Sequence, residues 1–120
     1  MATMNSTIEH IDRLKPNVYT DEDKYEWISR VNNMIATEVH QTEPVVYAIP
    51  DDADKELLVP APYDDLYGLY VASMIDFYNR EYGHYNNSTM MFSERLEAYK
   101  AWYIRQHNPE KAKNFRNVMG

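Results

Sequence analysis

The sequence predicts a mainly α-helical protein: a small bundle of about four helices, with a short β-hairpin or extended arm between the second and third helices and a C-terminal tail. Two observations predict this class. Apolar residues recur at the spacing of helices in several segments, and prolines and cap-forming residues separate those segments. The 120 residues suit a single domain, with a helical core at about 6–107, the arm at about 43–60 and the tail at about 108–120.

The first two helices each begin at a residue that can cap a helix N-terminus. The first is expected to start at Ser6 and to end before Pro16. The second is expected to start at Thr20, with Asp23 three residues later as in a capping box, and to run to about His40. Apolar faces at helical spacing support both: Ile8, Ile11 and Leu14 in the first helix, and Trp27, Ile28, Val31, Met34, Ile35 and Val39 in the second.

Residues 41–61 break the helical pattern. Two apolar runs, at 45–49 and 57–59, each end at a proline, and acidic turn residues lie between them. We therefore expect a small β-hairpin or an extended arm. Because a two-stranded hairpin is marginally stable alone, we expect the arm to pack against the helices or against a partner.

Two aromatic-rich helices are expected after the arm. Pro62 lies near the first turn of the third helix, and weak helix formers at 83–88 predict a kink or turn before the fourth helix, which Asn87 or Ser88 would cap. The third helix is apolar beyond a single stripe, which predicts that it is covered on two sides. The stripe residues are Tyr63, Leu66, Tyr67, Tyr70, Met74, Phe77 and Tyr78 in the third helix, and Met91, Phe92, Leu96, Tyr99, Trp102 and Tyr103 in the fourth.

The composition and motifs argue against catalysis and metal binding. The chain has no cysteine, which excludes thiolate metal sites, and it lacks a phosphate-binding Gly-rich loop. Glu81 and His84 have the spacing of half a di-iron motif, but the sequence contains no second copy. The acidic residues at 51–54 lack the remaining ligand positions of a calcium loop. We therefore expect no enzymatic activity and no cofactor.

The charge and hydropathy limit the possible partners. A net charge of −7 disfavours binding to the phosphates of nucleic acid, and no apolar run is long enough to span a bilayer. Eleven tyrosines suit half-buried faces and subunit interfaces. Gly68, in the third helix, indicates either a point where another backbone approaches closely or a sequence change that the helix tolerates without a structural reason. Residues off the main stripe are expected either at a subunit interface or simply exposed: Leu69, Ile75, Tyr82 and Tyr85.

Five stretches of the chain carry a resemblance to a known family: IDRLKPNVY, DEDKYEWISRVNNMI, ELLVPAPYDDLY, MIDFYNREYGHYNNSTMMF and YKAWYIRQH. In these stretches, which cover most of residues 8–108, the chain resembles the small head–tail connector proteins (neck adaptors, or head-completion proteins) of long-tailed bacteriophages and prophages of Gram-positive bacteria. The stretches contain no catalytic signature.

The resemblance implies a structural virion protein of the neck, made in the host cytoplasm. Copies, typically twelve, would form a ring beneath the portal, with DNA passing through the lumen as cargo and an acidic wall that does not hold it. By region, the tail would contact the portal through Phe115, Arg116, Val118 and Met119. The arm would contact the next neck component, a stopper or tail-completion protein, through Val45, Tyr47, Ile49 and Leu57. The alternative is a small helical protein-binding or regulatory module that uses its Tyr and Met surface as a groove.

Overall fold

The computed structural model describes residues 2–107, and the tail at 108–120 lies outside them. The described residues form four α-helices and two short helices of other types, which confirms the predicted mainly helical fold. These elements are α1 (Met4–Leu14), α2 (Asp21–Met34), the π-helix η1 (Ile35–Val39), the 3-10 helix η2 (Tyr63–Asp65), α3 (Leu66–Tyr78) and α4 (Tyr82–His107).

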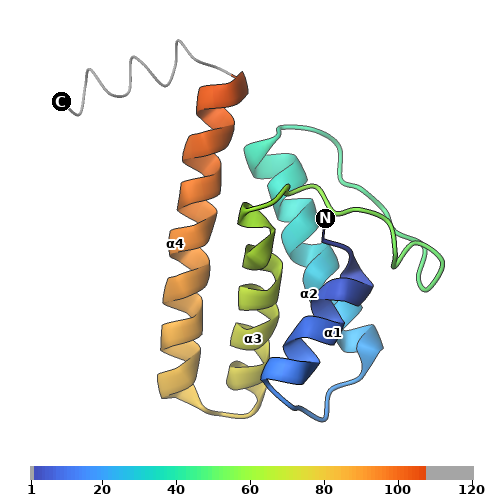
Figure 1. The fold of residues 1–120 in the computed structure, drawn as a ribbon, viewed down its shortest axis with the longest axis vertical. Helices are drawn as coiled ribbons and strands as arrows, with labels where there is room; N and C mark the ends of the chain where they lie inside the picture. Colours follow the sequence, from blue (N-terminus) through green and yellow to red (C-terminus); the bar gives the residue numbers. More distant parts are fainter. Residues whose placement is uncertain (1, 108–120) are drawn as a thin grey trace.

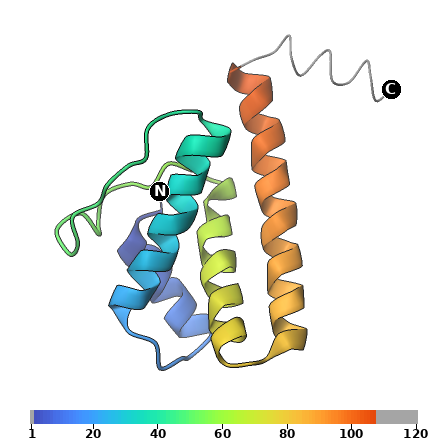
Figure 2. The ribbon, with the colours of Figure 1, turned by 180° about the vertical axis from the view of Figure 1, so that it is seen from behind.

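The helices form a flat slab with extents of 48 × 35 × 20 Å. α4, α3 and α2 lie side by side in that order, and α1 packs against α2 and α3 (Figures 1 and 2). α4 packs on α3 and η2 and extends beyond the end of α3 (Figure 1). Within residues 2–107 it makes no extensive contact with α1 or α2, so α4 is an edge helix.

The cap residues set where the first two helices begin. α1 starts three residues earlier than expected, because Thr3 rather than Ser6 is its N-cap. Ser6 is the third helical residue and completes a capping box, with Thr3 Oγ1 accepting from the Ser6 N–H at 3.0 Å and Ser6 Oγ from the Thr3 N–H at 2.9 Å. The predicted start of α2 is confirmed, since Thr20 Oγ1 accepts from the Asp23 N–H at 3.2 Å.

The segment between η1 and η2 is an extended arm, and the predicted hairpin is wrong. Residues 2–107 contain no β-strand, and the arm's β-type pairing is one isolated bridge between Thr3 and Glu56. The β-branched runs suggested strands because their composition suits a half-buried pleated surface. In the folded chain the two runs do not pair with each other, and side chains of the helices bind the second run instead.

A buried polar network fastens the arm to α2 and α3. Asn32, which is fully buried, accepts through Oδ1 from the Tyr67 hydroxyl at 2.6 Å and from the Leu58 N–H at 3.1 Å. The Tyr67 hydroxyl in turn accepts from the Val59 N–H at 3.0 Å, and Asn32 Nδ2 donates to the Tyr47 hydroxyl at 3.3 Å. Burial raises the pKa of Tyr67, so this phenol stays a neutral donor. The arm's backbone thus finds partners without a second strand.

The turn between α3 and α4 lies earlier than predicted. The weak helix formers at 83–88 are inside α4, and the helix break is centred on Arg80, whose φ is 60°. The Arg80 N–H donates to the Phe77 carbonyl at 3.0 Å and the Glu81 N–H to the Asp76 carbonyl at 2.9 Å, which is the paired bonding of a Schellman motif. Arginine occupies the left-handed position that glycine favours there, so no glycine marks the true helix break in the sequence.

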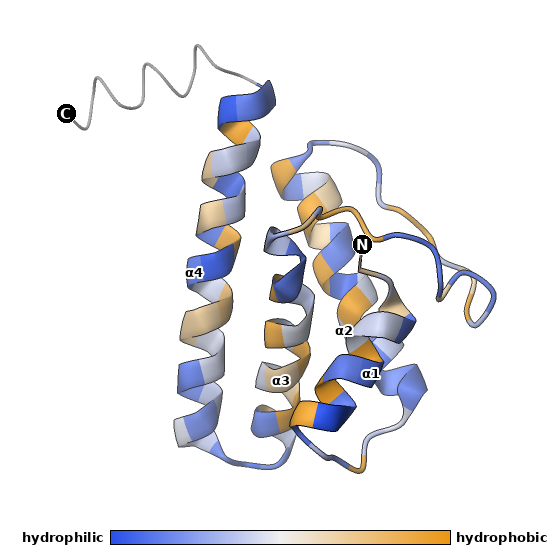
Figure 3. Ribbon diagram, in the orientation of Figure 1, coloured by the Kyte–Doolittle hydropathy of each residue, from blue (hydrophilic) through white to orange (hydrophobic). Residues whose placement is uncertain are grey.

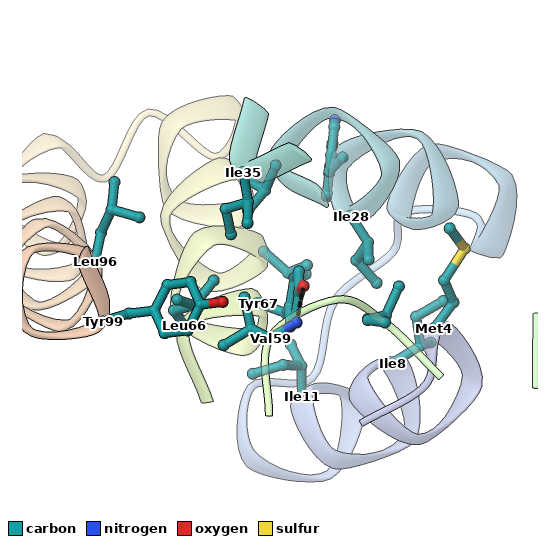
Figure 4. Close-up of a cluster of buried hydrophobic side chains, with 14 of the residues drawn as sticks. Met4, Ile8, Ile11, Ile28, Ile35, Val59, Leu66, Tyr67, Leu96 and Tyr99 are labelled. Atoms are coloured by element: carbon teal, nitrogen blue, oxygen red, sulfur yellow. Dashed lines mark hydrogen bonds between the residues drawn. The ribbon is translucent and has the colours of Figure 1, made fainter. Parts of the chain in front are cut away.

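The hydrophobic core is centred on α3, which contacts α1, α2 and α4. Figure 3 shows that apolar residues are dense along α3 and sparser along α4. The two-sided coverage predicted for the third helix is confirmed, although its stripe was misplaced: Val71 and Ile75 are fully buried, whereas Phe77 and Tyr78 are 44% and 52% exposed. The labelled core side chains in Figure 4 come from all four helices and the arm: Met4, Ile8, Ile11, Ile28, Ile35, Val59, Leu66, Tyr67, Leu96 and Tyr99.

Gly68 marks a close approach of α1 to α3. A Cβ atom at this position would lie 3.2 Å from Ile11 Cδ1, which is tighter than ordinary van der Waals contact. Glycine therefore leaves room for the Ile11 side chain of α1, so the close neighbour of Gly68 is a side chain and not the predicted backbone.

A buried ion pair joins three helices at the end of the slab near the α3–α4 turn. Asp76 of α3 is fully buried, and its carboxylate accepts from Lys15 Nζ, at the end of α1, and from the Ser88 hydroxyl of α4 at 2.7 Å. Ser88 was expected to cap the fourth helix but serves this carboxylate from inside α4 instead. A buried carboxylate is tolerated because both its oxygens are bonded and its charge is paired.

Candidate interaction surfaces

The first feature to consider is the placement of the acidic and histidine side chains. No group of three or more metal-ligating side chains occurs within residues 2–107. Glu81 and His84 are both exposed at the start of α4. In the acidic turn, Asp52 accepts from the Ala48 N–H at 2.7 Å and pairs with Lys55, which lowers the pKa of the Asp52 carboxyl. The Asp52 side chain thus stabilises the turn to which it belongs.

The exposed side of α4, which carries large apolar side chains among polar ones, is the first candidate surface. Of its 26 residues, Leu96 and Tyr99 are buried. Met90 and Met91 are 58% and 54% exposed, although Met91 was predicted on the packed face of this helix. We call this surface, with Ile104 at 37% exposure, the α4 edge. Such a face is typical of a helix that packs against a second chain.

A groove between α1 and α3 is the second apolar surface. It has a volume of about 590 Å³, and its polar lining residues are Ser6, Thr7, His10, Lys15, Asp64 and Asp65. Leu14 is 67% exposed there, and Leu69, predicted at a subunit interface, lines the same groove and is half-buried. α3 separates this α1/α3 groove from the α4 edge (Figure 1). The apolar lining residues are Ala2, Ile11, Leu14, Gly68, Leu69 and Ala72.

The other predicted interface residues separate into two groups. Ile75 is fully buried inside the protomer, so its assignment to an interface is wrong: it faces the core because α3 is covered on more sides than a single stripe suggests. Tyr82 is 57% exposed, and Tyr85 is half-buried with its ring centroid 5.3 Å from that of Phe77. These rings form an exposed aromatic corner where α3 meets α4, beside Tyr78.

The arm residues predicted to bind a partner also differ in exposure. Leu57 is 4% exposed and belongs to the core, so it offers no surface, and Tyr47 is half-buried and bonded to the Glu56 carbonyl at 3.1 Å. Val45 is half-buried, with its N–H donating to Asn33 Oδ1 at 3.1 Å. Ile49 remains 40% exposed. Phe115, Arg116, Val118 and Met119 lie outside the described residues.

An aromatic cap covers the ends of η1 and α4. The ring of His40 stacks on Tyr103 with centroids 4.4 Å apart, and His40 Nε2 lies 2.6 Å from the Tyr99 hydroxyl. Burial, and then the nearby His107, lower the pKa of His40, and burial raises the pKa of Tyr99 to about 12. The π-helix adds a residue per turn and so shifts where His40 falls on the helix. Both groups are therefore neutral near pH 7.

Sequence reasoning missed several exposed apolar residues. Leu14 and Met91 were assigned to apolar stripes, and the stripes alone do not say which of their members lie beyond the reach of a neighbouring helix. Val18 is 90% exposed in the α1–α2 loop, and Val46 is 87% exposed in the arm. The signal available in the sequence was that a chain this small contains more amphipathic helices than it can cover by its own packing.

Comparison of the chain with protein-family models, with curated proteins and with solved structures gave no match. The surfaces are therefore judged by their own geometry and chemistry. No helix within residues 2–107 combines the length and the apolar composition needed to cross a membrane.

Proposed function

We propose that this protein is a structural subunit of a bacteriophage neck, a head–tail connector whose copies, typically twelve, form a ring beneath the portal and join the capsid to the tail. It would reside in the virion, act without catalysis or cofactor, and be followed in the neck by a stopper or tail-completion protein. The observation that carries the proposal is the presence of two separate apolar surfaces on one small protomer, the α4 edge and the α1/α3 groove.

Two different surfaces suit a ring. A closed ring of identical copies uses a heterologous contact, in which one surface of each copy meets a different surface of the next. Leu14 in the groove and Met91 on the α4 edge are each more than half exposed. Isolated exposed apolar residues are normal, but a lined groove and an unpartnered helix face together are typical of association. We infer that the α4 edge of one copy packs against the α1/α3 groove of the next.

The charge of the chain agrees with a DNA-conducting ring. Nineteen acidic residues against twelve basic ones give a net charge of −7. A lumen wall poor in cations releases few counterions on contact with DNA, so DNA would pass without sticking. The same charge makes stable nucleic-acid binding by the free protein an unfavourable alternative.

The test is co-assembly of the purified chain with the portal protein of the same phage, followed by electron microscopy. We expect a ring of density under the portal. Leu14→Lys and Met91→Lys should each abolish the ring, because each places a charge in one half of the copy–copy contact. Val18→Lys is the matched control: Val18 is even more exposed but lies on neither surface, so the ring should persist. Circular dichroism verifies that all three variants are folded.

A protein-binding module is the alternative that the groove also favours. A partner helix could occupy the α1/α3 groove and leave the α4 edge unused. In that case Leu14→Lys would abolish partner binding while Met91→Lys would have no effect. Loss of the ring with both variants is the result that supports the connector, and no ring under any assembling condition contradicts it.

A further inference from the structure

The negative charge of the chain is concentrated at one edge of the slab. Residues 21–56, which form α2, η1 and most of the arm, hold ten acidic and three basic residues and so carry a net charge of −7, the same as the whole chain. Two of those three basic residues form ion pairs with acidic residues of the same segment: Arg30 with Glu26 and Lys55 with Asp52. This edge lies on the far side of α3 from α4 (Figures 1 and 2).

A groove crosses this acidic edge between the outer face of α2 and the arm. Ile49, 40% exposed, supplies an apolar wall, and the ring of Tyr25 supplies a second. Glu22 and Glu26 stand beside them with exposed carboxylates, and Glu22 has no ion-pair partner among the described residues. We call this the α2/arm groove; its lining residues are Glu22, Tyr25, Glu26, Ser29, Arg30, Asn33 and Ile49.

Residues 108–120 have the complementary composition. They hold three basic residues and one acidic residue, a net charge of +2, while residues 1–107 carry −9. Three of their side chains are large and apolar: Phe115, Val118 and Met119. A basic segment with spaced apolar anchors matches a groove lined by the apolar side chain of Ile49, by the Tyr25 ring and by two carboxylates against the one cation of Arg30.

Chain length favours a neighbouring copy over the same copy. Residue 108 follows the end of α4, which forms one edge of the slab, whereas α2 and the arm, which line the groove, lie at the other edge (Figure 1). The slab is 35 Å across. An extended chain covers about 3.3 Å per residue, so Phe115 reaches at most about 26 Å from His107. Within one copy the segment is therefore too short to carry Phe115 across the slab. In a ring, the α2 side of the next copy lies near the α4 side of the first, so the distance to be covered is shorter.

We propose that residues 108–120 of one copy dock in the α2/arm groove of an adjoining copy, with Phe115 against Ile49 and Tyr25 and with Lys111, Lys113 and Arg116 facing Glu22 and Glu26. The inference rests on the association of copies proposed above, and it names a sister copy, rather than the portal, as the partner of this segment. This contact brings oppositely charged groups of two copies together, in addition to the apolar contact between α4 and the α1/α3 groove.

Photo-crosslinking of the full-length chain tests this assignment. p-Benzoylphenylalanine is introduced in place of Phe115, isotopically light and heavy copies are mixed, and the cross-linked peptides are identified by mass spectrometry with and without portal protein. We expect mixed light–heavy cross-links from position 115 to residues 22–33 or 45–49. Glu22→Gln/Glu26→Gln should reduce their yield by roughly three- to tenfold, and added salt should reduce it too, since both act on exposed ion pairs.

A second double variant controls for a general effect of charge. Glu9→Gln/Glu38→Gln removes the same charge from exposed positions that lie on neither groove nor on α4, and it should leave the cross-link yield unchanged. Cross-links within one copy only, cross-links to the portal or to other helices instead of the groove, or equal losses in both double variants would each overturn the assignment. Portal-bound rings without groove cross-links refute this inference alone, whereas groove cross-links in an oligomer that ignores the portal refute the proposed function alone.

Discussion

Replacing Lys15 with methionine is expected to destabilise the fold by about 2–3 kcal/mol. The substitution keeps most of the apolar stem and removes the cation of Lys15, which is bonded to the fully buried carboxylate of Asp76. Breaking a fully buried pair costs about 3–5 kcal/mol. We expect the smaller loss of about 2–3 kcal/mol for Lys15→Met because the Lys15 side chain is 29% exposed and because the Ser88 hydroxyl still donates to Asp76.

A rescue experiment separates this charge effect from lost packing. Asp76→Asn removes the buried charge while keeping the shape of the side chain, so Lys15→Met/Asp76→Asn should be more stable than Lys15→Met alone. Urea unfolding followed by circular dichroism and tryptophan fluorescence gives the free energies. Lys55→Met, which breaks an exposed pair with Asp52, is the control and should change the stability far less than Lys15→Met does. A loss below about 0.5 kcal/mol for Lys15→Met, or no rescue by Asp76→Asn, would refute the reasoning.

Three further changes test other parts of the fold. Arg80→Gly should stabilise the protein by about 1 kcal/mol, because glycine adopts the positive φ of 60° without a Cβ penalty; an unchanged or lower urea midpoint would contradict the Schellman assignment. Tyr67→Phe should cost about 1–3 kcal/mol because it leaves the buried Val59 N–H without its acceptor, and a neutral result in thermal unfolding would show that this bond is dispensable. The pKa of His40 is lowered by burial and by His107, so the fold favours the neutral ring and stability should fall as the pH drops through about 6.5; His40→Phe should flatten that slope, and an equal slope in both proteins would exclude His40 as its source.

The sequence allowed the helices to be predicted because their signals are local. The start of α2 followed from the Thr20 cap, and the mainly helical class followed from apolar spacing. The α3–α4 turn was misplaced because the backbone places Arg80 in a left-handed conformation that the sequence usually marks with glycine. The hairpin was wrong because β-branched runs say nothing of the side chains, such as Asn32, that bind the arm's backbone from another element.

The candidate surfaces were less predictable than the helices. Leu69 and Tyr82 were predicted at the surface and do lie on it, but Ile75 is buried because α1, α2 and α4 together surround α3. Met91 was assigned to the packed face and is exposed, since α4 packs chiefly on α3 and η2 within residues 2–107. Helical spacing predicts which residues share a face, whereas the packing order of helices decides which faces stay open.

The central claim is that sister copies cover the α4 edge and the α1/α3 groove through a heterologous contact. The chain has no cysteine, so Leu14→Cys/Met91→Cys carries two unique thiols, one on each surface. Treatment of the portal-assembled variant with a short bis-maleimide, followed by denaturing electrophoresis, should give a ladder of covalent multimers that extends well beyond the dimer. Bands that stop at the dimer, or a monomer band alone, would contradict the claim, since a head-to-tail ring joins every copy to two neighbours.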